Sequence, residues 1–320
     1  MIYTQKDGRK LAKIALGGAD FGTNVSKQDS FALMDLYFEN GGNILDTARV
    51  YCTWLENGAN VSESTIGEWV KSRGVREQIW ISTKGGHPPI IDHHISRIQK
   101  KELRKDIEES LRYLQTDYID MYFLHRDDES KPVEEIMPIL HEFVKEGKAR
   151  YIGAGNWTAE RIAKANAFAR ENGLTPFSFS QIMWSYAKVN KEGEPDDTLV
   201  IMDEKEYAGC VENKDVILMP YSSQAQGFYT LAAERGVETL SDRHKAKYVN
   251  ETNLARLQTA KRISQECGLS PTAVGLNHLL RNTEIDTHPL IGGFNKELLL
   301  DSLQALDLPE KYFEEITEKP

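Results

Sequence analysis

The feature that most constrains the fold is a repeated alternation of two patterns along the chain. Short apolar runs rich in β-branched residues, typical of buried strands, alternate with longer amphipathic stretches, typical of helices that bury one face. About eight strand candidates occur, at residues 13–17, 43–48, 78–84, 118–125, 149–156, 177–185, 215–222 and 288–292. Sequential parallel strands need helical crossovers, and eight of them close a sheet on itself, so the pattern predicts a (β/α)8 barrel.

No linker rich in Pro or Ser divides the pattern, so we expect one barrel domain over residues 1–320. Residues 224–249, rich in Gly, Ala and charge, predict an inserted loop at the face where loops often act as lids. An open, doubly wound sheet is the alternative. The first strand-to-helix turn, at residues 17–22 (GGADFG), lacks the GxGxxG spacing of a dinucleotide-binding turn, which favours the barrel.

Charge and cysteine content narrow the class of partner. Asp and Glu total 49 against 39 Lys and Arg, and this net charge of −10 has the wrong sign for binding nucleic acid. No apolar run approaches the roughly 18 residues of a membrane span, and the N-terminus lacks the apolar region of a signal peptide. Three cysteines, Cys52, Cys210 and Cys267, are too widely spaced for a zinc pattern. We expect a cytoplasmic protein that acts on a small molecule, of unknown oligomeric state.

Polar side chains end three successive strand patterns. Asp46, Lys84 and His125 each follow an apolar run and are about one strand–helix unit apart, and Tyr51 lies shortly after Asp46. The working residues of (β/α)8 barrels come from the carboxyl ends of the strands. The sequence therefore predicts that an acid, a base, a phenol and an imidazole converge at one rim of the barrel.

These residues also carry a family resemblance. Leu45–Ala48 with Tyr51, Ser82–Lys84, Asp120–His125 and Gly153–Asn156 resemble, in order and position, the motifs of the aldo-keto reductases. The resemblance covers nearly the whole chain. It implies an enzyme that transfers a hydride between a nicotinamide cofactor and a small-molecule carbonyl or alcohol.

The catalytic roles follow from that reaction. Reduction places negative charge on the carbonyl oxygen, so the site needs a proton donor there, and Tyr51 is the candidate. A free phenol has a pKa of about 10, and we expect the Lys84 ammonium to lower it by stabilising the phenolate, with Asp46 holding Lys84 charged and in place. His125, as a neutral imidazole, would orient the carbonyl oxygen or relay a proton during oxidation.

The resemblance also assigns the cofactor contacts. It places the nicotinamide carboxamide against Asn156 and Gln181, the nicotinamide ring on Tyr221, and phosphate near Ser222. The adenosine end corresponds to the last strand-to-helix turn, formed by Gly292, Gly293, Phe294, Asn295 and Lys296. An arginine that often meets the 2′-phosphate of NADPH is absent from this turn. NADP(H) is expected over NAD(H) from the family alone.

The substrate pocket is predicted from side chains just past the strand ends. Trp54, Trp157, Trp184 and Tyr186 are flat rings that can stack on a cyclic substrate, and Arg126 follows His125. The loop after Tyr51 is longer than in the family, with Cys52 in place of glycine. Our hypothesis is a sugar-like or polyol-like carbonyl compound.

Two other classes of function stay open. The first is a cofactor-binding regulatory or sensor protein with the same fold and slow turnover. The second is a metal-dependent barrel isomerase or lyase, for which only Asp46 and His125 qualify as strand-end ligands, too few for a closed set. His87, His93 and His94 also lie together in one loop. These histidines lack the spacing of metal ligands and have no cysteine nearby, so we predict no metal site.

Overall fold

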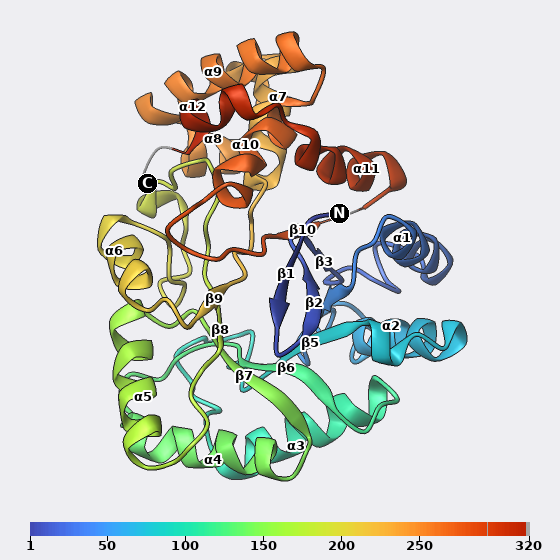
Figure 1. The fold of residues 1–320 in the computed structure, drawn as a ribbon, viewed down its shortest axis with the longest axis vertical. Helices are drawn as coiled ribbons and strands as arrows, with labels where there is room; N and C mark the ends of the chain where they lie inside the picture. Colours follow the sequence, from blue (N-terminus) through green and yellow to red (C-terminus); the bar gives the residue numbers. More distant parts are fainter. Residues whose placement is uncertain (293, 318–320) are drawn as a thin grey trace.

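The computed structural model describes residues 1–292 and 294–317. Its main sheet has eight parallel strands in the order β10-β3-β4-β5-β6-β7-β8-β9 (Figure 1). They are β3 (Ala15–Gly17), β4 (Ile44–Asp46), β5 (Trp80–Gly85), β6 (Ile119–Leu124), β7 (Ala149–Gly155), β8 (Phe179–Gln181), β9 (Ile217–Leu218) and β10 (Leu290–Gly292). His288 N donates to Leu218 O at 2.7 Å and Leu290 N to Pro220 O at 2.8 Å, which joins the two edges. The predicted (β/α)8 barrel is confirmed.

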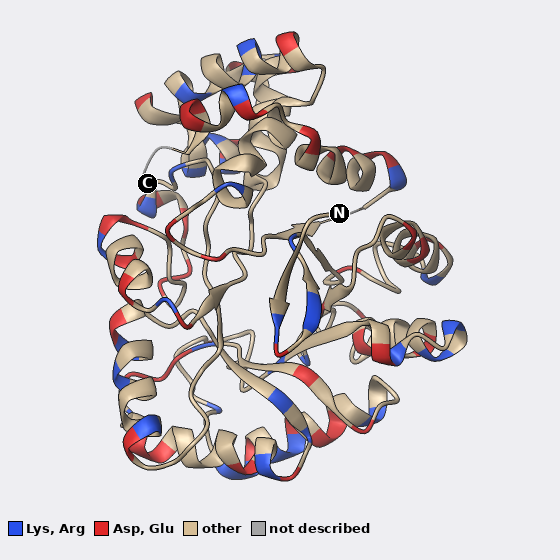
Figure 2. Cartoon of the chain, in the orientation of Figure 1, with Lys and Arg blue, Asp and Glu red and all other residues tan. Residues whose placement is uncertain are grey.

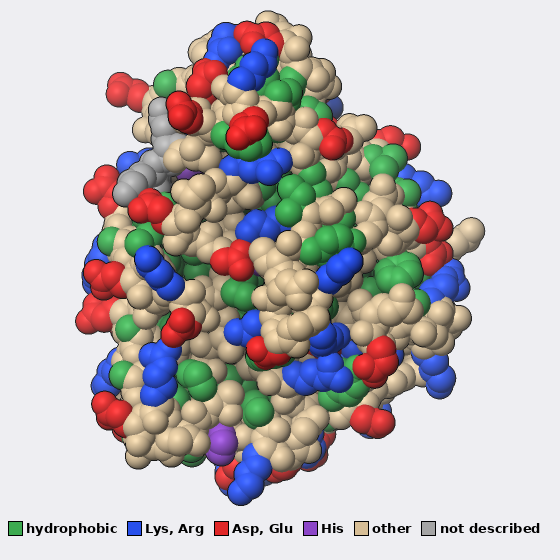
Figure 3. All heavy atoms as spheres, viewed as in Figure 1, with side chains coloured by type: hydrophobic (Ala, Val, Ile, Leu, Met, Phe, Trp, Pro, Cys, Tyr) green, Lys and Arg blue, Asp and Glu red, His purple; other side chains and the backbone are tan. Residues whose placement is uncertain are grey.

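Helices follow the strands and cover the outside of the sheet (Figure 1). They are α1 (Lys27–Glu39), α2 (Val61–Arg73), α3 (Lys100–Tyr113), α4 (Val133–Lys145), α5 (Ala159–Glu171), α6 (Glu204–Glu212), α10 (Pro271–Leu280) and α11 (Lys296–Gln304). In α3, Leu103 and Ile107 are buried, and in α4 Ile136 and Leu140 are buried, as their helical spacing predicts. Charged side chains of both signs lie along the outer helices (Figure 2) and intersperse over the face in Figure 3.

A β-hairpin precedes the barrel and was not predicted. Strands β1 (Tyr3–Lys6) and β2 (Arg9–Ala12) pair antiparallel, and Leu11 and Ala12 pack in one hydrophobic cluster with residues of the barrel strands such as Phe123. The indole of Trp80, on β5, donates to Lys10 O at 2.8 Å. The hairpin therefore covers the amino-terminal end of the barrel, opposite the strand ends that hold the polar residues.

The expected loop at residues 224–249 is mostly helical instead. It contains α7 (Phe228–Arg235) and α8 (Asp242–Tyr248), and the side chain of Ser241 caps α8 by accepting from His244 N. Phe228 and Tyr248 are buried in a hydrophobic cluster that also includes residues of α9 (Glu251–Cys267), α10 and α12 (Phe313–Ile316). Because this segment has its own buried contacts, it is not a free lid.

None of the helices in the described residues is both long and apolar enough to cross a lipid bilayer.

Candidate active site

The predicted polar residues meet at the carboxyl end of the barrel. Strands β4 and β5 are neighbours, and Asp46 is in register with Ser82, two residues before Lys84. The Lys84 ammonium donates to Asp46 Oδ2 at 2.6 Å, to Thr47 O at 2.8 Å and to Tyr51 Oη at 3.0 Å. Lys84 and Asp46 are 3% and 2% exposed, so this polar chain is shielded from water up to the phenol.

Two further donors hold the carboxylate of Asp46. Ser82 Oγ donates to Asp46 Oδ1 at 2.6 Å, and Gln181 Nε2, from β8, donates to the same oxygen at 2.8 Å. The sequence analysis assigns no role to Ser82. Its position two residues before Lys84 is the signal for one, because alternate residues of a strand face the same side. With both oxygens bonded, the carboxylate is fixed in the orientation that holds Lys84.

His125 follows β6, and its backbone N–H donates to Gly85 O at 2.9 Å, at the end of β5. Its ring centroid lies 5.8 Å from that of Tyr51, with the two rings nearly perpendicular at 81°. Burial, and then the positive charges of neighbouring groups, hold the pKa of His125 well below its ordinary value. The imidazole is therefore neutral near pH 7, as predicted.

The pKa of Tyr51 differs from the prediction. Burial raises the pKa of the phenol above 10, Lys84 lowers it, and the negative charge of Asp46 raises it again. Lys84 thus acts in the expected direction, but burial outweighs it. Burial likewise disfavours the charge on Lys84, yet the attraction of Asp46 and Tyr51 is stronger and raises the pKa of Lys84. The resting site holds a neutral phenol beside a firmly charged ammonium.

A cleft of about 160 Å³ adjoins this group. Asp46 and Tyr51 line one part of it, and Tyr221, Ser222 and Gly292 line the side formed by the ends of β9 and β10. The ring of Tyr221 offers a flat surface beside the phenol of Tyr51. The residues predicted to flank the nicotinamide ring therefore do lie next to the polar group.

The side-chain amides of Asn156 and Gln181, predicted to bind the nicotinamide carboxamide, form hydrogen bonds within the protein. Asn156 Oδ1 accepts from Tyr221 Oη at 2.6 Å and from Val200 N at 3.2 Å, while Asn156 Nδ2 donates to His125 O at 3.2 Å. Gln181 donates to Asp46, as described above. In this state the two amides position Tyr221, His125 and Asp46.

The turn predicted to hold the adenosine end is organised by a residue that the sequence did not single out. Gln224 Oε1 accepts from Gly292 N at 3.2 Å, and Gln224 Nε2 donates to Ser302 Oγ of α11 at 2.8 Å. Its place in the same turn as Ser222 is the only signal for it in the sequence. Asn295 caps α11 by accepting from Leu298 N at 2.9 Å.

The remaining residues of this turn are open to solvent. Phe294 is 59% exposed, and Lys296, the first residue of α11, is also exposed. Gly293, which was predicted to contact the cofactor, lies outside the described residues. A helix N-terminus with an exposed lysine suits a phosphate group.

The predicted substrate residues separate into two groups. Trp54 is 51% exposed with its ring centroid 6.5 Å from that of Tyr51, and Arg126 is buried beside His125, donating to His125 O, Thr198 and Asp196. These two lie at the site.

The other two indoles do not line the cleft. Trp157 is 1% exposed, stacks edge-on against Phe177 and donates to Arg126 O at 3.3 Å. Trp184 is 3% exposed and packs against His278. Tyr186, a third ring predicted for the pocket, is also buried, against Tyr229. Their positions just past strand ends did not reveal that these rings turn into the protein.

The histidine-containing loop contributes one ring to the site. His87 lies edge-on to His125, with ring centroids 4.6 Å apart, and burial lowers the pKa of His87 to about 4. His93 Nδ1 lies 2.9 Å from Asp196 Oδ2, on the opposite loop. Within residues 1–292 and 294–317, no three His, Cys, Asp or Glu side chains cluster as metal ligands would.

Comparison with known proteins settles the family. A sequence profile of the aldo/keto reductase family matches residues 13–319. The chain belongs to the aldo/keto reductase family. This aldo/keto reductase is 30% identical to norsolorinic acid reductase of Aspergillus flavus, over 96% of the chain and 76% of the relative.

Two further relatives are aryl-alcohol dehydrogenases. A putative aryl-alcohol dehydrogenase of Saccharomyces cerevisiae is 30% identical, over 96% of the chain and 82% of the relative. An NADP(+)-dependent aryl-alcohol dehydrogenase of Phanerodontia chrysosporium is 28% identical, over 94% and 80%. With this family membership, the protein is an oxidoreductase.

Proposed function

We propose that this aldo/keto reductase uses NADP(H) to interconvert an aromatic or similarly apolar carbonyl compound and its alcohol. The observation that carries the proposal is the continuous chain from Asp46 through the Lys84 ammonium to the Tyr51 phenol, with distances of 2.6 and 3.0 Å. It ends at a cleft bordered by Tyr221 and Ser222. Such a chain controls a proton at one defined oxygen, as carbonyl reduction requires.

The nicotinamide, when bound, supplies or accepts the hydride. In the reducing direction the Tyr51 hydroxyl donates its proton to the substrate oxygen, on which negative charge develops. Lys84 stabilises the resulting phenolate through its 3.0 Å hydrogen bond. His125 is neutral, so it can donate one hydrogen bond to the same substrate oxygen and orient it. In the oxidising direction the phenolate accepts the alcohol proton.

The residues present fit a nicotinamide dinucleotide. The ring of Tyr221 borders the cleft next to Tyr51, and Ser222 begins the turn that Gln224 ties to Gly292 and α11. At the far end, the exposed Lys296 and the N-terminus of α11 offer positive charge for a phosphate. These features, together with the NADP(+)-dependent relative, support NADP(H) as the cofactor.

The proposed substrate is apolar because an exposed indole, that of Trp54, lies beside the phenol of Tyr51. The sugar-like substrate expected from the sequence rested on four rings at strand ends, of which only Trp54 is exposed at the mouth. Ile91 and Ile95, in the loop that also carries His87, are 94% and 50% exposed. The indole beside the phenol, with apolar side chains on a loop that reaches the site through His87, favours a hydrophobic ring over a polyhydroxylated one. The names of the aryl-alcohol dehydrogenase relatives agree with this class.

The proposal is tested by following oxidation of NADPH, and separately of NADH, by purified protein with benzaldehyde or with an aldose. We expect turnover of benzaldehyde with NADPH, and kcat/KM at least about tenfold higher for the aromatic aldehyde, since one well-placed apolar ring changes binding by more than about 1.4 kcal/mol.

Two results would overturn parts of it. Absence of turnover with both aldehydes and both cofactors, in protein shown to be folded, would remove the reductase assignment. A tenfold preference for the aldose would restore the carbohydrate hypothesis. Lys296→Ala supplies the test of cofactor choice, because it should raise the Kd for NADPH more than that for NADH.

A further inference from the structure

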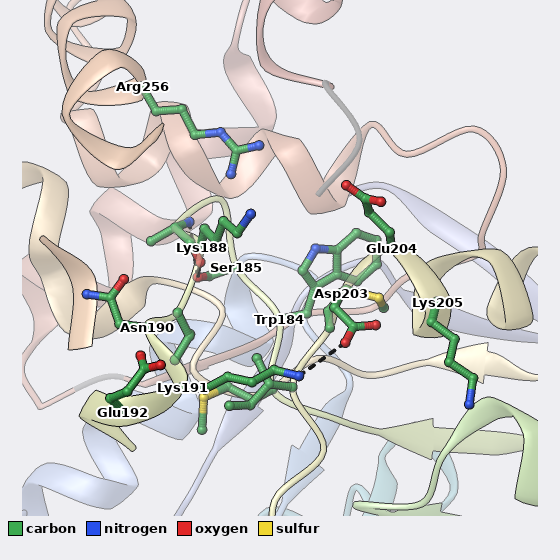
Figure 4. A pocket seen from close by; sticks show the side chains of 15 residues that line it. Trp184, Ser185, Lys188, Asn190, Lys191, Glu192, Asp203, Glu204, Lys205 and Arg256 are labelled. Carbon is green, nitrogen blue, oxygen red and sulfur yellow. Dashed lines mark hydrogen bonds and ion pairs between the residues drawn. The ribbon is translucent and has the colours of Figure 1, made fainter. Parts of the chain in front are cut away.

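A second cavity, of about 620 Å³, lies outside the catalytic site. It is bounded by the segment that follows β8, by the start of α6 and by Arg256 of α9 (Figure 4). Among the described residues that line it, none belongs to the catalytic group or to the predicted cofactor contacts. The proposed reductase function leaves this cavity unexplained.

One stretch of backbone separates the cavity from the catalytic cleft. Met183 lines the cavity and pairs as a β-bridge with Tyr221, which lines the cleft. Trp184 N donates to Tyr221 O at 3.3 Å, and Met183 N donates to Val200 O at 2.9 Å. The two spaces are therefore neighbours divided by hydrogen-bonded backbone, and a ligand of one is not a ligand of the other.

The cavity contains a buried donor without an acceptor. Trp184 is 3% exposed, and its Nε1 has no hydrogen-bond partner among the residues that the structure describes. In Figure 4 this nitrogen faces the side of the cavity where the Lys188 ammonium and the Arg256 guanidinium lie. A buried N–H without an acceptor costs about 1–3 kcal/mol, so an acceptor supplied by a ligand would remove a real penalty.

The lining carries charges of both signs, with Glu192, Asp203 and Glu204 among its acidic residues. On the side that the indole nitrogen faces in Figure 4, the charged groups are those of Lys188 and Arg256, which favours an anion at this place. Lys188 is exposed and forms no ion pair within residues 1–292 and 294–317. The other two lysines that line the cavity form ion pairs, Lys191 with Asp203 at 3.3 Å and Lys205 with Glu160 at 3.2 Å. Asp203 also caps α6 by accepting from Glu206 N. Trp184 therefore offers a neutral hydrogen-bond donor to the cavity, and Lys188 offers a positively charged one.

The rest of the lining is apolar near Trp184. Met183, Val189, Ile201 and Met202 contribute side chains to the wall. A hydrated inorganic ion would gain nothing from this surface, whereas a ligand with a hydrocarbon body would bury area on it. Thioether side chains adapt to rings and chains of different shapes.

We propose that this cavity is a second ligand site, which binds a small organic carboxylate. The carboxylate accepts from Trp184 Nε1 and pairs with Lys188, and the hydrocarbon part packs on the methionines and Ile201. A monocarboxylate with one aromatic ring satisfies both requirements within the available volume.

The test is calorimetric titration of the full-length protein with benzoate, and with benzamide as a neutral ligand of the same ring that is neither the aldehyde nor the alcohol of the proposed reaction. We expect saturable binding of one benzoate and binding of benzamide that is at least about tenfold weaker, since hydrogen bonds to a charged group contribute more than about 1.4 kcal/mol. Trp184→Phe and Lys188→Ala should each raise the Kd for benzoate by at least about tenfold on the same basis.

Lys205→Ala is the matched control, because Lys205 borders the same cavity but pairs with Glu160 and points away from Trp184 in Figure 4. It should leave the Kd within about twofold, as expected for an exposed ion pair. Lys188 is exposed, so its variant tests the site even if Trp184→Phe does not fold. Absence of saturable benzoate binding, equal affinity for benzamide, or an unchanged Kd in either folded variant would overturn the proposal.

Discussion

Lys84 connects the buried carboxylate of Asp46 to the phenol of Tyr51, and each of the three side chains has one task in the proposed reaction. Asp46 is held by Ser82 and Gln181, so it cannot rotate away from Lys84. Lys84 keeps its charge, and Tyr51 keeps its proton until negative charge develops on the substrate oxygen. The group therefore responds to charge in the transition state rather than to bulk pH.

Tyr51→Phe is the first residue-level prediction. Loss of the proton donor should lower kcat for carbonyl reduction by at least about 100-fold, within the range of general acid catalysis. The Kd for NADPH should change by less than about threefold, because the phenol acts on the proton and not on the nucleotide. Steady-state kinetics and fluorescence titration measure the two quantities. Tyr3→Phe, on the N-terminal hairpin, is the control, and normal turnover in Tyr51→Phe would exclude the role.

The pH dependence follows from the directions of two pKa shifts. Reduction needs Tyr51 protonated, and its pKa is raised above 10, so this requirement fails only as pH rises through that value. The pKa of His125 lies well below 6.5, so the imidazole stays neutral through the neutral range. We expect kcat/KM for reduction to be flat between about pH 7 and about pH 10 and to fall only at higher pH. A break near neutral pH in the rate of the chemical step would contradict these assignments.

The buried ion pair makes a separate prediction for stability. The side chains of Lys84 and Asp46 are 4% and 2% exposed, so removal of one partner leaves a buried charge without compensation. Lys84→Met leaves the Asp46 carboxylate unpaired and Asp46→Asn leaves the Lys84 ammonium unpaired, so each should lower the free energy of unfolding by about 3–5 kcal/mol. The double variant should lose less than the sum of the two. Urea unfolding of the four proteins measures the coupling, and strict additivity would show that the pair is not coupled.

Helix α2 packs closely against the end of α3 through a glycine. A Cβ on Gly67 would lie 2.5 Å from the backbone of Leu114, at the end of α3. Gly67→Ala should therefore destabilise the protein by about 1–3 kcal/mol, as overpacking does, although alanine is the better helix former. Thermal unfolding measures this loss. Lys71→Ala, on the exposed side of the same helix, should change stability by less than about 0.5 kcal/mol, and a stabilised Gly67→Ala would show that the two helices can separate.

Local sequence patterns predict where a helix or strand begins more reliably than they predict which of its side chains are buried. Serine followed by proline is typical of a helix start, and the Ser270 side chain caps α10 by accepting from Ala273 N. The composition of residues 224–249 predicts a loop, because Gly, Ala and charged residues obscure the apolar periodicity of α7. Its Phe228 and Tyr229 are buried against helices distant in the sequence. The short hairpin β1–β2 has an alternating, half-exposed pattern, and Tyr3–Lys6 lacks the apolar run that marks a barrel strand.

For the whole molecule, cofactor binding should appear as added stability. A ligand that binds only the folded state stabilises it by about 2.7 kcal/mol at a concentration 100 times its Kd. We expect NADPH to raise the melting temperature of this aldo/keto reductase, and NADH at the same concentration to raise it less. Differential scanning fluorimetry across a concentration series makes the comparison. An equal effect of the two cofactors would contradict the NADP(H) preference proposed from Lys296.

The barrel and the meeting of Asp46, Lys84 and His125 were predictable because both depend on order along the chain. Parallel strands joined by helices place their carboxyl ends at one rim, so residues that end successive strands converge without knowledge of packing. The directions of Trp157 and Trp184 and the net pKa shift of Tyr51 were not predictable in this way. Asn156 has a φ of 58°, which turns the backbone just before Trp157. The direction in which the Trp157 ring packs depends on segments distant in the sequence, such as the one that contains Phe177. Burial is a sum over all neighbours of a group, and only the folded chain brings those neighbours together.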